Sequence, residues 1–223
     1  MTELTLILGN KNYSSWSLRP WLLMKHFQIP FAEIRVPLYS DSSLAKLKKL
    51  SPSGKVPALI AGDFIVWDSL AICEYIADQY PQFECWPKDP RSRATARSMS
   101  AEMHSGFQDL RSYFPMNIRK RVPWDGAPEA VMRDIERITE LWQCCIDCPK
   151  SDGPWLFGKF GIVDAMFAPV VWRFVTYNVP VDETCKQYMD NMLALPEMQE
   201  WVDAACAETE VIMESEKMPG VVA

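Results

Sequence analysis

The chain has 223 residues and a formal net charge of −6, with 48% hydrophobic and 23% charged residues. This composition predicts a packed core, in one large domain or two small ones. It argues against nucleic-acid binding, because the longest basic run is only Arg119 to Arg121. No apolar run approaches the roughly 20 residues that span a bilayer, and the N-terminus has no signal-peptide pattern. We therefore expect a cytoplasmic protein without membrane contact.

The seven cysteines do not predict a metal or redox site. Cys145 and Cys148 form a C-x-x-C pair, but the sequence has no second ligand pair and only two histidines. We interpret the cysteines as incidental thiols that behave as small buried hydrophobic groups. No bound metal is expected.

The first 80 residues alternate short strand patterns with helical patterns. The predicted order is β-α-β-α-β-β-α, in which a crossover unit is followed by a hairpin with a Gly62-Asp63 turn. We expect a small mixed sheet with helices on both faces. The expected strands are residues 4–8, 33–38, 57–61 and 64–67, and the expected helices are residues 18–27, 44–50 and 68–80.

A proline-rich segment, residues 81–90, separates this half from a second half with helical patterns only. One long helix is expected over residues 91–114, and the most apolar helix, residues 162–177, is expected at the centre. The tail after Glu208 is polar, and we expect it to be loosely held. The other expected helices are residues 128–148, 185–195 and 196–207.

The stretch NYSSWSLRPW, residues 12–21, places Ser14, Ser15 and Ser17 between a predicted strand and a predicted helix. Serine caps helices, so a structural role is one interpretation. The other is that one hydroxyl holds a reactive group at the helix N-terminus, where the helix dipole favours an anion.

Two further segments carry polar groups at similar junctions. SPSGKVPAL, residues 51–59, has a Val-Pro step before a strand, and WDSLAICEYI, residues 67–76, starts a helix with Asp68 and Ser69. Read alone, these are an ordinary loop proline and a capping pair. FGIVDAMFAP, residues 160–169, places Asp164 near the start of the central helix, and we interpret it as a structural cap.

Taken together and in this order, the segments resemble the cytosolic glutathione S-transferase family, and SSWSLR is similar to the serine-type segment SSCSWR of its zeta class. The resemblance covers about the whole chain. It implies an α/β thioredoxin-like N-terminal domain over residues 1–81, a linker over residues 82–90 and an all-α C-terminal domain over residues 91–223. This is the glutathione transferase fold, and the resemblance also implies a homodimer.

By this resemblance Ser14 is the catalytic hydroxyl, with Ser15 as the alternative in the next register. The hydroxyl would stabilise the thiolate of glutathione and would not act as a nucleophile. The residues implied to bind glutathione are Ser17, Lys55, Val56, Pro57, Asp68 and Ser69.

Each implied glutathione contact has a physical reason. A cis bond at Pro57 would turn the main chain of Val56 toward the peptide, as an added strand would require. Lys55 would meet the glycyl carboxylate. Ser69, at a helix N-terminus, would bind the γ-glutamyl carboxylate, and Asp68 would face the ammonium group.

The second substrate is expected between the domains, against the helix predicted over residues 91–114. Met99, Met103, Phe107 and Arg111 recur every four residues and could form one stripe, although such a stripe more often belongs to a core. The candidate second-substrate residues are Trp16, Met103, His104, Phe107 and Arg111.

The reaction implied is the attack of activated glutathione, as co-substrate, on a small hydrophobic electrophile. The zeta pattern has a cysteine where this chain has Trp16, which argues against maleylacetoacetate isomerisation. The absence of cysteine between Asn10 and Arg19 argues against mixed-disulfide chemistry. Two alternatives stay open: a glutathione-dependent cis-trans isomerase of the maleylacetoacetate type, and a non-catalytic partner-binding protein with this fold.

Overall fold

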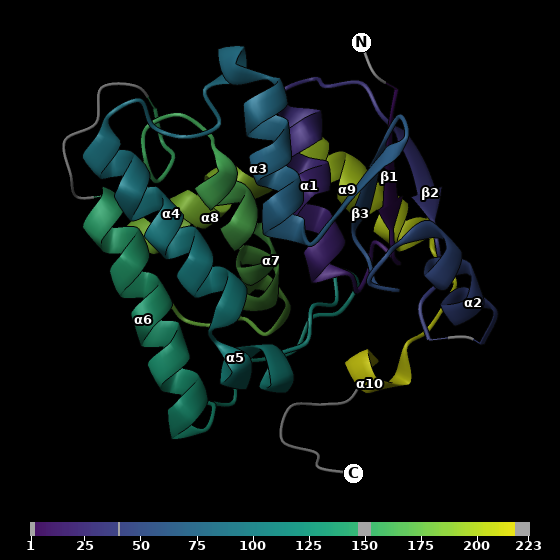
Figure 1. The fold of residues 1–223 in the computed structure, drawn as a ribbon. Coiled ribbons are helices and arrows are strands. Elements are labelled where there is room, and N and C mark those ends of the chain that lie inside the picture. The colour runs from purple at the N-terminus through teal and green to yellow at the C-terminus, as the bar shows by residue number, and fades with distance from the viewer. Residues whose placement is uncertain (1–2, 40, 147–152, 217–223) are drawn as a thin grey trace.

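The computed structural model describes residues 3–39, 41–146 and 153–216. Figure 1 shows a small sheet with its helices on one side of the molecule and a group of helices on the other. The strand order is β2-β1-β3-β4, with β1 parallel to β2 and the other two pairs antiparallel. The strands are β1 (Leu4–Leu8), β2 (Ala32–Arg35), β3 (Ala58–Ala61) and β4 (Phe64–Trp67).

Three helices accompany the sheet, in the predicted β-α-β-α-β-β-α order. Both faces of β1 are buried, because Leu6 and Leu8 pack into the main core and Ile7 points to the opposite side. There Ile7 meets Leu47 of the second helix in a small separate cluster. The three helices are α1 (Ser15–His26), α2 (Asp41–Leu50) and α3 (Ser69–Gln79).

The second strand is shorter than the predicted residues 33–38. It ends at Arg35, and the main-chain N–H of Val36 still donates to the carbonyl of Leu8 at 2.8 Å. Pro37 follows and has no N–H. The ladder stops there because proline cannot donate the next hydrogen bond.

The second half is helical, as predicted, and α7 (Ile162–Thr176) lies at its centre with almost every side chain buried. Asp164 accepts from the N–H of Gly161 at 3.0 Å, so it caps this helix as expected. The other elements are a 3-10 turn (Pro81–Phe83), α4 (Pro90–Ser105), α5 (Gln108–Tyr113), α6 (Glu129–Ile146), α8 (Glu183–Leu193), α9 (Pro196–Ala207) and α10 (Met213–Glu216).

The prediction of one helix over residues 91–114 is wrong. Helix α4 ends at Ser105, Gly106 is extended, and Phe107 has a φ of 59° before α5 begins. The buried side chain of Phe107 sits at this turn. The chain therefore changes direction between the two helices, and the four-residue stripe expected along one helix is interrupted.

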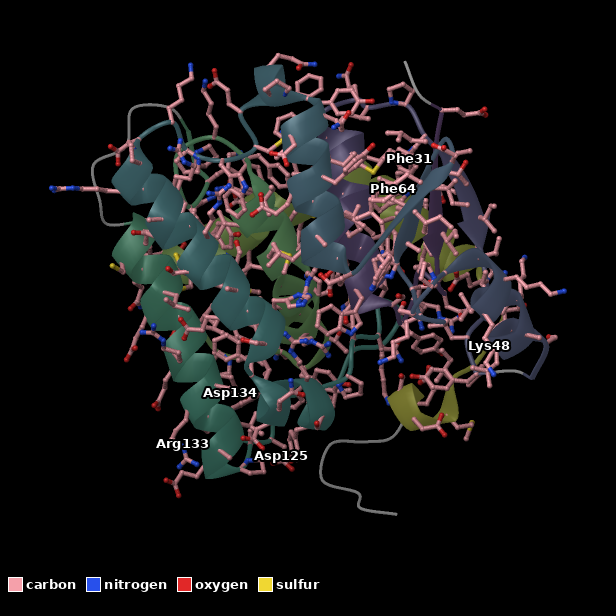
Figure 2. All side chains as sticks on the ribbon, in the orientation of Figure 1. Phe31, Lys48, Phe64, Asp125, Arg133 and Asp134 are labelled. Atoms are coloured by element: carbon pink, nitrogen blue, oxygen red, sulfur yellow. The ribbon has the colours of Figure 1, made fainter. Side chains whose placement is uncertain are left out.

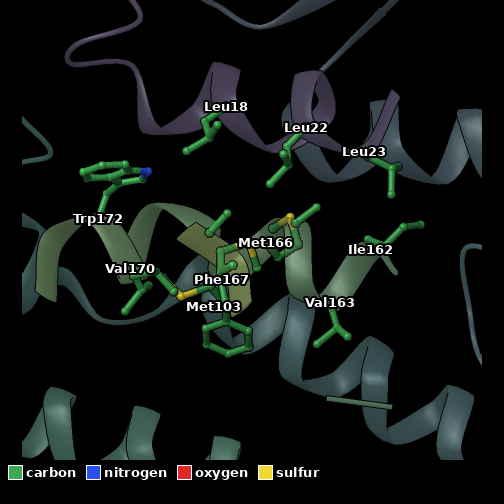
Figure 3. Close-up of a cluster of buried hydrophobic side chains, with 14 of the residues drawn as sticks. Leu18, Leu22, Leu23, Met103, Ile162, Val163, Met166, Phe167, Val170 and Trp172 are labelled. Carbon is green, nitrogen blue, oxygen red and sulfur yellow. The ribbon is translucent and has the colours of Figure 1, made fainter. Parts of the chain in front are cut away.

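One hydrophobic core joins the two halves. Figure 3 shows Leu18 and Leu22 of α1 facing α7, with Met103 of α4 on the other side of that helix. Met166 of α7 has no exposed surface. Fully burying an aliphatic side chain contributes roughly 1.5–3 kcal/mol. The position of α1 relative to α7 is therefore fixed by packing along their shared face.

Residues 208–216, which we name the C-terminal strap, contact the loop that precedes α1. The carboxylate of Glu208 accepts hydrogen bonds from the main-chain N–H groups of Lys11 and Asn12 at 2.7 and 3.1 Å. The expectation of a loosely held tail is wrong over these residues. Sequence patterns could not show the contact, because the partners are almost the whole chain apart.

The far end of the strap reaches the residue before Ser14. The carboxylate of Glu216 accepts from the hydroxyl of Tyr13 at 2.6 Å and from the side-chain amide of Asn117 at 2.9 Å. Arg119 also donates to the Tyr13 hydroxyl, at 3.0 Å. The loop that ends at Ser14 is thus held from the second half of the molecule.

Candidate active site

Ser14 is the N-cap of α1, at the junction with the loop that follows β1. Its Oγ accepts from the main-chain N–H of Ser17 at 3.4 Å and lies 2.7 Å from Oγ of that residue. The first turn of α1 contains no acidic residue. The positive end of the helix dipole is therefore not neutralised locally, and it favours an anion beside Ser14.

The three serines have different partners. Ser15 is nearly buried, and its hydroxyl accepts from a guanidinium nitrogen of Arg173 at 3.3 Å. Ser17 is fully buried, and its hydroxyl accepts from the N–H of Gly9 at 3.1 Å. Ser14 is also nearly buried, and of the three hydroxyls it is the one that donates a hydrogen bond among the described residues, to Oγ of Ser17.

The step from Val56 to Pro57 is a cis peptide bond, as expected from the sequence. Pro57 is buried directly before β3, Val56 is half-buried, and Lys55 is exposed. The roles expected for these residues toward glutathione remain predictions.

The N-terminus of α3 carries a second set of polar groups. Asp68 is the N-cap, and its Oδ1 accepts from the N–H groups of Leu70 and Ala71 at 2.9 and 3.2 Å. Ser69 is buried, and its hydroxyl has no hydrogen-bond partner among the described residues. A buried hydroxyl without a partner is costly. A ligand carboxylate at this helix N-terminus would satisfy it.

The other oxygen of Asp68 reaches across to α4, where Oδ2 lies 3.0 Å from Nε2 of His104. Partial burial lowers the pKa of His104, while the Asp68 carboxylate raises it and nearby Arg19 and Arg111 lower it further. Burial is the largest of these effects. The contact therefore joins the cap of α3 to a neutral imidazole in α4 at pH 7.

The indole ring of Trp16 is in contact with two guanidinium groups. The guanidinium carbon of Arg19 is 4.3 Å from the centre of the indole ring, and that of Arg111 is 4.6 Å away. The ring of His104 meets the indole edge-on, with ring centres 5.3 Å apart. These cation–π contacts attract both arginines to the same side chain next to Ser15.

Arg173 adds a third buried guanidinium to this region, which we name the arginine cluster: Arg19, Arg111 and Arg173. Burial, and then repulsion from the other arginines, lowers the pKa of Arg19 and that of Arg173, the latter to about 10. Burial also lowers the pKa of Arg111, and the nearby Asp134 carboxylate opposes this effect. Arginine nevertheless stays charged at neutral pH. In the described part of the chain none of the three forms an ion pair with a carboxylate.

The arginine cluster is held by carbonyl groups instead. Arg19 donates through Nε to the carbonyl of Met166 at 3.2 Å, and its Nη1 has no partner among the described residues. Arg111 donates to the carbonyls of Met103 and His104. A nearby carboxylate, Asp134 (Figure 2), is engaged with the N–H of Leu110 at 2.9 Å. The cluster therefore retains unbalanced positive charge that suits an anionic group.

The structure separates the candidate second-substrate residues into two groups. Trp16, His104 and Arg111 come together at the partly exposed face beside Ser15. Met103 and Phe107 are buried in the core, with 1% and 7% of their surface exposed. Their part in binding a substrate remains a prediction.

Sequence reasoning did not select Arg19 and Arg173. A signal was present, because each is a single charge within an apolar helical segment, LRPWLL for Arg19 and VVWRFV for Arg173. Buried charges of this kind are uncommon unless they are paired or functional.

Two hollows in the surface lie away from Ser14. One, of about 670 Å³, lies between residues 84–95, Cys144, Cys145 and residues 156–163, and the other, of about 400 Å³, lies beneath the strap next to Lys11 and Arg35. Among the described residues, no cluster of three or more His, Cys, Asp or Glu side chains could hold a metal. None of the helices described combines the length and apolar character needed to cross a bilayer.

Comparisons with known proteins agree with this geometry. Family models described as "Glutathione S-transferase, N-terminal domain" and "Glutathione S-transferase, C-terminal domain" match residues 13–79 and 118–204. A Caenorhabditis elegans protein named "Probable maleylacetoacetate isomerase" is 36% identical over 167 residues, 74% of this chain and 76% of that protein. "Glutathione S-transferase GstB" of Escherichia coli strain K12 is 23% identical over 200 residues, 88% of this chain and 90% of that protein.

A solved structure shows the same fold. The crystal structure of a glutathione transferase homolog from Burkholderia gl BGR1, with bound glutathione, has a TM-score of 0.72 at 25% identity. The match covers 92% of this chain and 100% of that one. The predicted family and the predicted two-part fold are confirmed. Both family models match in order, and the C. elegans relative is 36% identical over 74% of this chain. The chain therefore belongs to the glutathione S-transferase family of enzymes.

Proposed function

We propose that Ser14 activates the thiol of glutathione for attack on a small hydrophobic electrophile. The observation that carries this proposal is the position of Ser14, whose hydroxyl caps α1 at a helix end without acidic residues. A relative with bound glutathione supports the choice of co-substrate.

The chemistry follows from the pKa of the thiol. A free thiol has a pKa near ~8.5, so little of it is thiolate at neutral pH. The Ser14 hydroxyl would donate to the sulfur, and the helix dipole would favour its negative charge. The thiol proton leaves to water, the thiolate forms a carbon–sulfur bond with the electrophile, and any leaving group departs with its electron pair.

The N-terminus of α3 would hold the other end of the tripeptide. The unpartnered hydroxyl of Ser69 suits the γ-glutamyl carboxylate, and the carboxylate of Asp68 suits the ammonium group. The main chain of Val56 would pair with the peptide beside Pro57, and Lys55 would meet the glycyl carboxylate.

We also propose that the protein is a homodimer. Phe64 (labelled in Figure 2) and Trp67, at the two ends of edge strand β4, are 57% and 48% exposed. Exposed large apolar side chains on a strand at the edge of a sheet favour contact with a second copy. Light scattering coupled to gel filtration tests this, and a monomer at micromolar concentration would contradict it.

A second candidate is the cis-trans isomerisation of an unsaturated carboxylic acid. Here the thiolate adds to one carbon of the double bond, the resulting single bond rotates, and elimination restores the double bond and the thiolate. The arginine cluster favours this candidate, because guanidinium groups pair with carboxylates. The C. elegans relative carries an isomerase name. This similarity supports isomerisation, whereas Trp16, at the position of the zeta-class cysteine, argues against it.

The deciding experiment measures glutathione consumption and product formation over a substrate panel, with wild-type protein, Ser14→Ala and Ser15→Ala. We expect Ser14→Ala to lose activity by an order of magnitude or more while binding to glutathione-agarose persists. Conjugates with glutathione indicate the transferase, and conversion without net consumption indicates the isomerase. If Ser15→Ala is the damaging change, the catalytic hydroxyl is one residue later than proposed.

A further inference from the structure

Ser17 lies in the first turn of α1, yet its side chain has no exposed surface. Its Oγ is 2.7 Å from Oγ of Ser14 and accepts from the N–H of Gly9 at 3.1 Å. A hydroxyl buried in this way has no surface that a substrate can touch, so the structure does not favour the direct contact with glutathione expected for Ser17 from the sequence. Any influence of Ser17 on the reaction must therefore pass through Ser14.

The hydrogen bonds of the two hydroxyls leave one proton unused. A serine hydroxyl has one proton to donate and two acceptor sites. In the structure Ser14 donates to Oγ of Ser17, whose second acceptor site is taken by Gly9. No other acceptor for the Ser17 proton is found in the described part of the chain. The bond between the two hydroxyls can therefore reverse without displacement of either oxygen.

The end of strand β1 fixes Ser17 from the other side. A Cβ atom added at Gly9 would lie 2.7 Å from Cδ1 of Leu38 and 3.2 Å from Cβ of Ser14. A larger residue at this position would require the Leu38 side chain to move and would crowd Ser14. The N–H of Gly9 can donate to Oγ of Ser17 in both orientations of the Ser17 proton, because it uses a lone pair of that oxygen.

We propose that Ser17 is a positioning residue that reverses its hydrogen bond with Ser14 when glutathione ionises. The proton of Ser14 turns to the sulfur, the proton of Ser17 turns to Oγ of Ser14, and Gly9 continues to donate to Ser17. One proton leaves from the thiol to water, and no bond forms between glutathione and the protein. The inference rests on the proposed role of Ser14.

Reversal strengthens the contact with the sulfur. Hydrogen bonds in a chain polarise one another, so a hydroxyl that accepts from a neighbour donates more strongly itself. Ser17 would therefore lower the pKa of the bound thiol beyond the effect of Ser14 alone. A residue that merely caps the helix would change stability and leave this pKa unchanged.

The test is a pH titration of thiolate absorbance in protein saturated with glutathione, for wild type, Ser14→Ala, Ser17→Ala and the double variant. Ser100→Ala is the matched control, because the Ser100 hydroxyl in α4 is also fully buried and has no partner among the described residues. We expect Ser17→Ala to raise the thiol pKa by about 0.5 to 1 unit, and Ser100→Ala to leave it at the wild-type value.

The double variant separates the alternatives. If Ser17 acts through Ser14, the double variant has the thiol pKa of Ser14→Ala, with no additional shift. A further rise in the double variant, or no rise in Ser17→Ala, overturns the role of Ser17 while the role of Ser14 stands. If Ser14→Ala itself leaves the thiol pKa unchanged, the proposed function fails first.

Thermal unfolding of each variant shows whether it is folded. If Ser17→Ala is not folded, Ser17→Cys replaces it in the titration. Cysteine keeps a side chain of similar shape and is a weaker hydrogen-bond donor. The same rise in the thiol pKa is expected from Ser17→Cys, and a wild-type value would overturn the proposal.

Discussion

Nε2 of His104 lies 3.0 Å from Oδ2 of Asp68, so a histidine of the helical half contacts the residue that caps α3 in the sheet half. The same carboxylate accepts two main-chain N–H groups through its other oxygen. Asp68 therefore has a capping role and a charge, and the two can be separated by substitution.

The substitution Asp68→Asn removes the charge and keeps an oxygen for the cap. Asparagine caps helices about as well as aspartate, and it tolerates the positive φ of 77° found here. We expect the free energy of unfolding to change by less than about 0.5 kcal/mol, while the KM for glutathione rises at least several-fold. Urea unfolding and steady-state kinetics measure the two effects.

A matched control is Asp89→Asn, which changes the N-cap of α4. It should leave the KM for glutathione unchanged. An equal rise in KM for both variants would show that loss of an aspartate cap, and not the missing charge at Asp68, causes the effect.

The pKa of His104 should be below the ordinary value of 6.5, since burial favours the neutral imidazole. Its contribution to stability is then fully present above that ordinary value and is lost as the pH falls through the lower folded value. In Asp68→Asn the pKa of His104 should fall further, because the carboxylate opposes the effect of burial. NMR titration of the imidazole protons checks both statements, with His26→Asn to assign the signals. A midpoint above 6.5 would contradict them.

Replacement of Arg19 by methionine tests whether the arginine cluster serves binding more than stability. Arg19 is buried with one donor unpartnered, and a charge in this state is costly to the fold. We expect the free energy of unfolding of Arg19→Met to be unchanged or higher by up to about 2 kcal/mol, measured in urea without ligand. Inhibition by a dicarboxylic acid should weaken. A loss of stability with unchanged inhibition would assign Arg19 to the fold.

The substitution Glu208→Ala should destabilise the protein by about 2–4 kcal/mol, because two main-chain N–H groups lose a charged acceptor at a nearly buried position. The control is Glu210→Ala in the same strap, where the carboxylate forms a partly exposed ion pair with Arg35 at 2.7 Å. That change should cost less than about 1 kcal/mol. If urea unfolding shows the same loss of unfolding free energy for both variants, the hydrogen bonds of Glu208 to Lys11 and Asn12 do not contribute more than the Glu210 ion pair.

The sequence predicted most of the fold because its elements follow local rules. The strand at Leu4–Leu8, the turn at Gly62 and the central apolar helix all appear where hydrophobic period and turn chemistry place them. The break at Phe107 did not follow from such rules. There a non-glycine residue adopts a positive φ because its side chain is buried in the core, and tertiary packing overrides the helical pattern.

The site was predicted in part. Local chemistry identified Ser14 as a cap and the Asp68-Ser69 pair at a second helix N-terminus. It did not show that Arg173 reaches Ser15, since these residues are 158 positions apart. The bond between Ser14 and Ser17 is local, but the contact of Ser17 with Gly9 brings the end of β1 against α1 and did not follow from the local pattern.

The strap joins the two ends of the described chain at the loop before α1. Glu208 is 197 positions after Lys11, and Glu216 is 203 positions after Tyr13. Domains tend to fold from the N-terminal end during translation. A polypeptide still on the ribosome would therefore complete the four-stranded sheet before the strap contacts the loop that precedes α1. The loop before Ser14 would therefore gain its contacts with Glu208 and Glu216 only when synthesis is nearly complete.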